Sequence, residues 1–170
     1  MLKAVGSLLL LFGCLSIGMV NVKQMDKRIK TLQSLLCAME VMEREMSFSV
    51  PLLEDIMIIS SQSTESAVRS FLSMCSYELK KGSDDPFCAI WNRAAREHLT
   101  ALKENDLEHV LALGNVLGRY DSEGQRQAIL RTHAVIKQML SNAQADRNSR
   151  SKVYKTVSAT AGVFLVILLL

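Results

Sequence analysis

Residues 113–125 read LGNVLGRYDSEGQ, and this stretch predicts the end of one helix, a turn and the start of the next. Gly114 and Gly118 are four residues apart, so they share a helix face that another helix can approach closely. Gly118 is also a suitable residue to end that helix. Asp121 and Gln125 bracket the start of the next helix. The residues to which we assign this packing and turn role, in preference to direct contact with a partner, are Leu113, Gly114, Leu117, Gly118, Asp121 and Gln125.

Similar signals divide the rest of residues 23–155 into helices. The composition, rich in Leu, Met, Ala and charged residues with long side chains, favours helix throughout, and the whole chain has only two prolines. Pro51 ends the first helix near Phe48 and opens the second. Gly82 ends the third, and Asp85-Pro86 opens the fourth. The predicted helices cover approximately 23–48, 52–60, 65–81, 87–99, 105–118 and 122–155.

An apolar face runs along the predicted helices at a spacing of three and four residues. In the first helix it consists of Ile29, Leu32, Leu36, Met39 and Met46, and Glu43 interrupts it. In the third and fourth it consists of Val68, Phe71, Leu72, Cys75 and Leu79, and of Phe87, Ile90, Trp91, Ala94 and Leu99. In the last two it consists of Leu107, Val110, Leu111, Leu113 and Leu117, and of Ile129, Val135, Ile136, Met139 and Leu140. These faces predict an all-α bundle in which the first and last helices are antiparallel neighbours.

Both ends of the chain are apolar. Residues 4–22 and residues 156–170 contain no charged side chain. As helices they would measure roughly 28 Å and about 22 Å, against a hydrocarbon layer of about 30 Å. We therefore predict a transmembrane helix over 1–22, a helical domain over 23–155 and a second transmembrane helix over 156–170. The second span is short, so it requires local thinning of the bilayer, or only dips into the lipid.

Cations flank the middle segment at both junctions, while Lys3 is the only cation beyond either apolar stretch. The membrane-flanking residues are Lys23, Lys27, Arg28, Lys30, Arg147, Arg150, Lys152 and Lys155. Cationic flanks resist translocation, so we predict that the middle domain is cytoplasmic and both termini lie outside. Residues 11–14 (LFGC) resemble a lipoprotein cleavage box, but the bulky Phe12 and the basic flanks favour an uncleaved span with a buried Cys14.

The distribution of charge argues against a nucleic-acid-binding protein. The chain has 20 cations and 17 anions. Without Lys3, the eight flanking cations, Asp26 and Asp146, the middle domain retains 11 cations and 15 anions. A nucleic-acid interface requires the opposite balance, with cations gathered on one face. The basic residues at the two junctions are better suited to anionic lipid headgroups.

No motif of catalysis or of metal binding is found. His98, His109 and His133 have no partner at the spacing of metal ligands, and the cysteines form no CxxC pair. Phosphate-binding and nucleophile-elbow motifs are also missing from the sequence. Asp84 and Asp85 suit the start of a helix better than a carboxylate pair. We therefore predict no catalytic, cofactor-binding or metal-binding residues and no enzymatic activity.

The string from 113 to 125, together with three other features, resembles the stage III sporulation protein AB family. These features are residues 49–54 (SVPLLE) with Pro51 and Leu52, the single Trp91, and the tail LVILLL at 165–170. The resemblance implies a place in the mother-cell membrane around the forespore, within a multi-protein channel that links the two cells. It also implies a soluble domain similar to the cytoplasmic helical domain of type II secretion platform proteins, which connect a motor ATPase to the membrane machine.

Two functions are compatible with this reading. By the resemblance, the chain is a non-enzymatic scaffold or adaptor that docks a stage III sporulation protein AA-like ATPase and contacts other channel subunits and membrane lipids. The alternative is a membrane-bound regulator that senses a lipid or a small ligand and has no motor partner.

Overall fold

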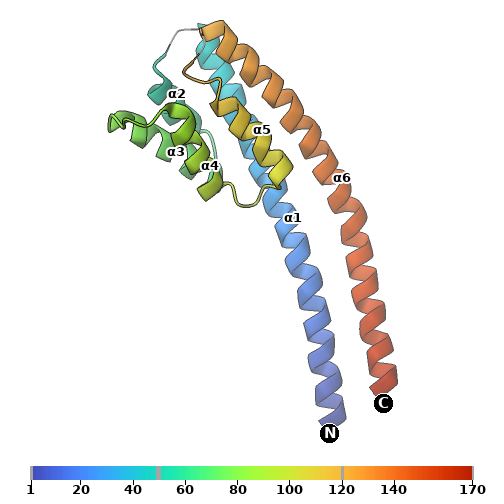
Figure 1. The fold of residues 1–170 in the computed structure, drawn as a ribbon. Helices are drawn as coiled ribbons and strands as arrows, with labels where there is room; N and C mark the ends of the chain where they lie inside the picture. The colour runs from blue at the N-terminus through green and yellow to red at the C-terminus, as the bar shows by residue number, and fades with distance from the viewer. Residues whose placement is uncertain (1, 49–50, 120, 170) are drawn as a thin grey trace. The chain divides into compact units, whose positions relative to one another are not determined.

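The computed structural model describes the backbone of residues 2–48, 51–119 and 121–169, and the side chains of 22–48, 51–65, 67–119, 121–149 and Thr160. Over these residues the regular secondary structure is entirely helical and contains no strand (Figure 1). The helices are α1 (Leu2–Phe48), α2 (Leu53–Gln62), α3 (Ser66–Lys80), α4 (Phe87–His98), α5 (Glu104–Gly114) and α6 (Ser122–Leu169). The predicted all-α class with six helices is confirmed.

The chain forms two compact units. One contains residues 1–27 and 142–170, and the other, which we call the bundle, contains Arg28–Ser141. Among the residues that the structure describes, no helix combines the length and the hydropathy that a membrane span requires. Except for Val22 and Thr160, the side chains of the predicted spans 4–22 and 156–170 lie outside the described residues. Both spans stay predictions.

Within the bundle, α1 and α6 are antiparallel. Glu43 of α1 contacts Arg126 at 3.0 Å, and Glu40 contacts His133 at 3.3 Å. Residue numbers therefore fall along α1 as they rise along α6. In the other unit, Asp26 Oδ1 accepts a hydrogen bond from Arg147 Nε at 2.8 Å, which again joins α1 to α6.

The face of α1 that enters the core differs from the predicted one. Leu32 and Met39 are buried as expected, but Ile29, Leu36 and Met46 are only half-buried. The residues that complete the buried face are Leu35, Ala38, Val41 and Met42. Residues 32–42 are apolar at most positions, so their periodicity permits more than one face. The neighbouring helices decide which of these faces is buried.

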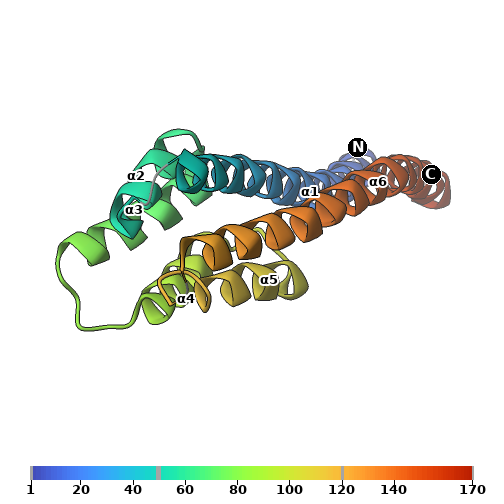
Figure 2. The same ribbon diagram turned by 90° about the horizontal axis from the view of Figure 1, so that it is seen from above.

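Helix α2 packs against α3, α3 against α4, and α4 against α5 (Figure 2). Their buried side chains, with those of α6 and of the connecting residues Leu99 and Leu117, form the rest of the core: Ile56, Met57, Val68, Phe71, Leu72, Cys75, Ile90, Trp91, Ala94, Leu107, Val110, Leu113, Ile129 and Ile136. Most were predicted. Val135 was expected in the core but is exposed, because it is adjacent to Ile136 and successive residues of a helix point about 100° apart.

The start of α5 lies within one residue of its predicted position. Helix α5 begins at Glu104, where the sequence predicts a start near Asn105. The Asp106 carboxylate accepts a hydrogen bond from the backbone N–H of Lys103 at 3.1 Å. This is one half of a capping box, and Lys103 cannot supply the other half because its side chain has no acceptor.

Candidate functional site

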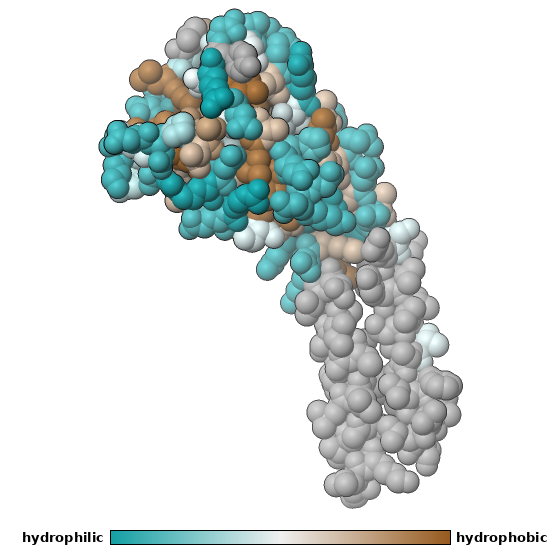
Figure 3. Space-filling view, viewed as in Figure 1, coloured by the Kyte–Doolittle hydropathy of each residue, from teal (hydrophilic) through white to brown (hydrophobic). Residues whose placement is uncertain are grey.

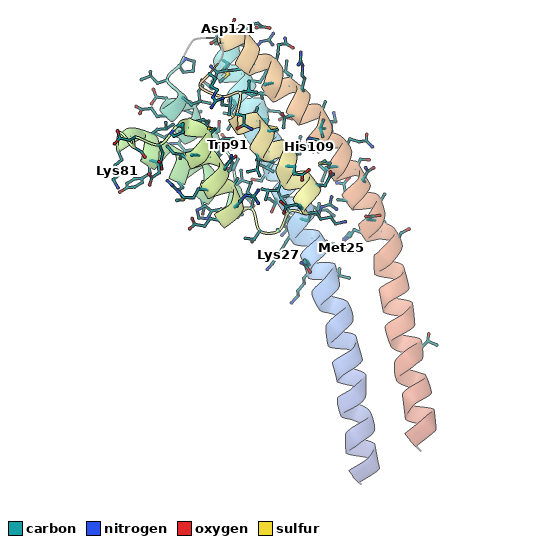
Figure 4. The ribbon with its side chains drawn as sticks, viewed as in Figure 1. Met25, Lys27, Lys81, Trp91, His109 and Asp121 are labelled. Atoms are coloured by element: carbon teal, nitrogen blue, oxygen red, sulfur yellow. The ribbon has the colours of Figure 1, made fainter. Side chains whose placement is uncertain are left out.

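Two segments singled out in the sequence, 51–54 and 113–125, meet at one end of the bundle. A Cβ atom placed on Gly118 would lie 3.5 Å from Leu53 Cδ2 and 3.9 Å from Phe87 Cβ. Asp121, at the start of α6, lies at the same end (Figure 4). Along α1 this end is roughly 30 Å from Arg28 at the other limit of the bundle. We call it the bundle tip and define it by Phe48, 51–55, Gly118, Arg119 and 121–126.

Behind the tip, Trp91 of α4 packs directly against the end of α5. A Cβ atom on Gly114 would overlap Cδ1 and Cγ of the Trp91 ring and would lie 2.8 Å from Nε1. The indole N–H donates a hydrogen bond of 2.7 Å to the carbonyl of Val110, one turn earlier in α5. Only glycine permits this approach of ring to backbone. The ring also contacts Phe71 edge-on, with centroids 4.6 Å apart, and joins three helices in the core.

Two side chains stabilise the turn between α5 and α6 by hydrogen bonding to backbone N–H groups. They are Gln125 of α6 and Asp121, the N-cap of α6. Gly118 has a φ of +80°, a conformation in which a side chain is strained, and its N–H donates to Gln125 Oε1 at 3.1 Å. Asp121 Oδ1 accepts from the backbone N–H of Gly124 at 3.2 Å, the position of an N-cap bond. The predicted shared helix face of Gly114 and Gly118 is wrong, because α5 ends at Gly114 and Gly118 lies in the turn beyond it.

At the other end of the bundle, α1 and α5 are joined by a buried ion pair. Arg28 Nε and Nη2 donate to the two carboxylate oxygens of Asp106 at 2.6 and 2.9 Å. The Asp106 side chain is 2% exposed and that of Arg28 is 14% exposed. Sequence reasoning assigned Arg28 to the membrane flank and overlooked this pair. The two residues are 78 positions apart, and no local spacing signals such a contact.

Arg126 holds two carboxylates near the tip. Its guanidinium bonds Glu123 within α6 and Glu43 of α1, each at 3.0 Å. The hydrogen bonds from Arg126 and then from Gln127 lower the pKa of Glu123 to about 2. Arg126, followed by the Ser47 hydroxyl, also lowers the pKa of Glu43 from its ordinary value. The contact between α1 and α6 at this end therefore contains carboxylates that stay ionised in mild acid.

The surface of the tip carries large apolar side chains. Phe48 is 85% exposed and Leu52 is 66% exposed, the two highest values among the large apolar residues of the described chain. Pro51, between them, is half-buried. Figure 3 shows apolar surface over the start of α2. Of the predicted family residues, Leu52 is thus the one with an exposed apolar side chain, whereas Trp91, Leu113 and Leu117 are in the core.

The predicted membrane-flanking cations have varied surroundings. Lys23, Lys27 and Lys30 are exposed on α1, and Arg147 is bonded to Asp26. The side chains of Arg150, Lys152 and Lys155, like that of Cys14, lie outside the described residues. Within the described part of the chain, no three His, Cys, Asp or Glu residues are grouped so that they could hold a metal ion. The flanking role stays a prediction.

Comparison with known proteins identifies the family. A family profile described as stage III sporulation protein AB matches residues 3–170. The chain belongs to the stage III sporulation protein AB family. Stage III sporulation protein AB of Bacillus subtilis (strain 168) is 24% identical over 173 residues, which cover all of both chains. A solved structure of a stage III sporulation protein AB has the same fold, with a TM-score of 0.64 and 20% identity over 72% of this chain and 98% of that one.

Membership of the stage III sporulation protein AB family gives this chain a role in sporulation. The names of the relatives describe a sporulation protein and include no enzymatic activity. Residues 113–125, which carry the resemblance to the family, have a structural role in this chain. Their glycines, Asp121 and Gln125 build the α5–α6 turn and admit Trp91, and so hold the residues of the tip in place.

Proposed function

We propose that this protein is a non-enzymatic membrane adaptor of the channel complex between mother cell and forespore. Its apolar ends anchor it in the mother-cell membrane around the forespore, and its helical bundle faces the mother-cell cytoplasm. There the bundle docks a secretion-type ATPase similar to stage III sporulation protein AA and links it to the other channel subunits. The single observation that supports this most is the family match over 3–170, which includes both apolar ends together with the bundle.

The construction of the bundle supports an adaptor over a ligand sensor. Trp91 on Gly114 joins α4 to α5, Gln125 joins α6 to the turn at Gly118, and Arg28 with Asp106 joins α1 to α5. Contacts that tie most of its helices together suit a body that holds a partner in a defined position. A sensor of a small ligand requires instead a concave site with convergent polar groups.

The proposal is tested in sporulating cells by deleting this protein and locating the ATPase by membrane fractionation. We expect the ATPase to move from the membrane to the cytosol, and to return when the full chain is restored. An ATPase that stays fully membrane-bound contradicts the docking role. Affinity purification of the full chain in mild detergent then separates the two classes of function. Channel subunits and the ATPase should co-purify with an adaptor, whereas only lipid or a small molecule should co-purify with a sensor.

The orientation is tested separately. Protease added to the outer side of intact vesicles should leave the bundle uncut if it faces the cytoplasm. Digestion of the bundle from that side would remove the basis for contact with a cytoplasmic ATPase.

A further inference from the structure

We infer that the bundle tip is the docking surface for the cytoplasmic partner of the proposed function, and that the partner provides an apolar pocket bordered by Lys and Arg. Phe48 and Leu52 are the apolar anchors, and the acidic residues around them form the rim. This inference rests on the proposed adaptor role and adds to it the surface and the chemistry of the contact.

The two anchors belong to one surface. Phe48 is the last residue of α1 and Leu52 immediately precedes α2, so their Cα atoms lie within about 14 Å of one another. Among the side chains that the structure describes, the other exposed large apolar residues lie elsewhere: Tyr77 on α3, and Leu130 and Val135 on α6. Isolated exposed apolar side chains are ordinary on a protein surface. Two that are 85% and 66% exposed on one short connection form a pair suited to filling a partner's pocket.

The structure holds these anchors in a defined place. Leu53, next to Leu52, lies against the position of Gly118, whose N–H is bonded to Gln125 of α6. Phe48 ends α1, and α1 is bonded to α6 five residues earlier through Glu43 and Arg126. Anchors that are fixed before binding lose less conformational entropy on association than anchors on a mobile loop.

The charge of the tip indicates the charge of the partner surface that fits it. The tip contains four carboxylates, those of Glu54, Asp55, Asp121 and Glu123, and two guanidinium groups, those of Arg119 and Arg126, a net charge of −2. Arg126 is bonded to Glu123 within the tip and to Glu43 of α1, while Asp55 and Asp121 are exposed. An apolar centre with an acidic rim is complementary to an apolar pocket with a cationic rim.

The same charge disfavours two other occupants. A second copy of the chain placed tip to tip would bring two surfaces of net charge −2 together, and like charges oppose such a contact. Anionic lipid headgroups would be repelled for the same reason. A cationic protein surface is the occupant that this charge favours.

The apolar part is tested with the purified full chain in detergent and the purified secretion-type ATPase, by measuring the Kd for wild type, F48S/L52S and Y77S. Tyr77 is a matched control because it is 63% exposed but lies on α3 outside the tip. We expect F48S/L52S to weaken binding about tenfold or more, and Y77S to leave the Kd within about twofold. Unchanged thermal unfolding of both variants would show that the bundle is still folded.

The acidic rim is tested with D55K, and E97K is its control because Glu97 is exposed on α4. We expect D55K to weaken binding about tenfold at about 50 mM salt and less at about 300 mM salt, because salt screens exposed charges. E97K should have little effect. Equal weakening by D55K and E97K would contradict a localised acidic rim.

Photocrosslinking from position 48 in the membranes of sporulating cells, with position 77 as control, identifies the occupant. An ATPase adduct formed from 48 and not from 77 supports the inference, whereas an adduct with a second copy or with lipid overturns it. If wild type and F48S/L52S bind the ATPase equally, the tip is not the docking surface while the adaptor role stands. If wild type does not bind the ATPase, both proposals fail.

Discussion

The indole of Trp91 occupies the space in which a side chain at position 114 would begin, and its N–H is bonded to the carbonyl of Val110 at 2.7 Å. One glycine therefore decides how closely α4 approaches α5. Trp91 is 1% exposed and contacts Phe71 as well, so any displacement of the ring is transmitted into the core.

Gly114→Ala should lower the free energy of unfolding by about 1–3 kcal/mol, because the new Cβ overlaps a ring that is packed on its other sides. The measurement is denaturant unfolding of the full chain in detergent, followed by the fluorescence of Trp91, the only tryptophan. Ala112→Ser, at an exposed position of the same helix, should change the stability by less than about 0.5 kcal/mol. A Gly114→Ala protein as stable as wild type would contradict the close packing.

Substitutions at Gly118 separate the cost of backbone conformation from the cost of steric overlap. A Cβ there meets only ordinary contacts, but the φ of +80° costs a side chain about 1–2 kcal/mol. Gly118→Ala should therefore be destabilising by about that amount, and Gly118→Asn by less, because asparagine tolerates this conformation better. Thermal unfolding of the two variants side by side gives the order. The reverse order would indicate that space, and not φ, limits this position.

Asp106→Leu should destabilise the bundle by about 3–5 kcal/mol, because it leaves the Arg28 guanidinium buried without its carboxylate. Arg28→Met should have an effect of similar size. The double variant R28M/D106L should be less destabilised than the sum of the two, since it removes both charges together. A double-mutant cycle of unfolding free energies measures this coupling. Additive effects would show that the pair contributes nothing as a pair.

Stability should fall in acid through the Arg126 cluster. The folded-state pKa of Glu123 is about 2 against an ordinary value of 4.5, and that of Glu43 is also lowered. Because both are depressed, their stabilising contribution is complete above about pH 4.5 and is lost as the pH falls toward 2. Arg126→Gln should flatten the dependence of unfolding free energy on pH in this window. Arg131→Gln, an exposed change on the same helix, should leave the slope as it is.

The number and order of the helices could be predicted from the sequence because their signals are local. Pro51, Gly82 and Gly118 interrupt runs of helix-forming residues, and each acts through its own backbone. Trp91 was predicted in the core for the same reason, since it follows the apolar spacing of its own helix. The acid–amide pattern at Asp121 and Gln125 likewise marked a helix start within a few residues.

The contacts that give the candidate site its form depend on residues far apart in the chain. The partner of Arg28 is 78 positions away, and nothing near Arg28 distinguishes it from the exposed Lys27 and Lys30. The buried face of α1 depends on its neighbours, because residues 32–42 have more than one apolar side. The residues of the tip lie together only because the turn at Gly118 packs against Leu53, which is far from it in the sequence.

The sequence alone therefore determined the helices, their boundaries to within a few residues, and the apolar character of both ends. These follow from backbone propensity and from periodicity, which act over a few residues. The tertiary structure decided that Trp91 packs against Gly114, that Arg28 is a partner of Asp106, and that Phe48 and Leu52 share an exposed tip. Those outcomes depend on which helix faces meet, and that choice is made by packing the whole bundle at once.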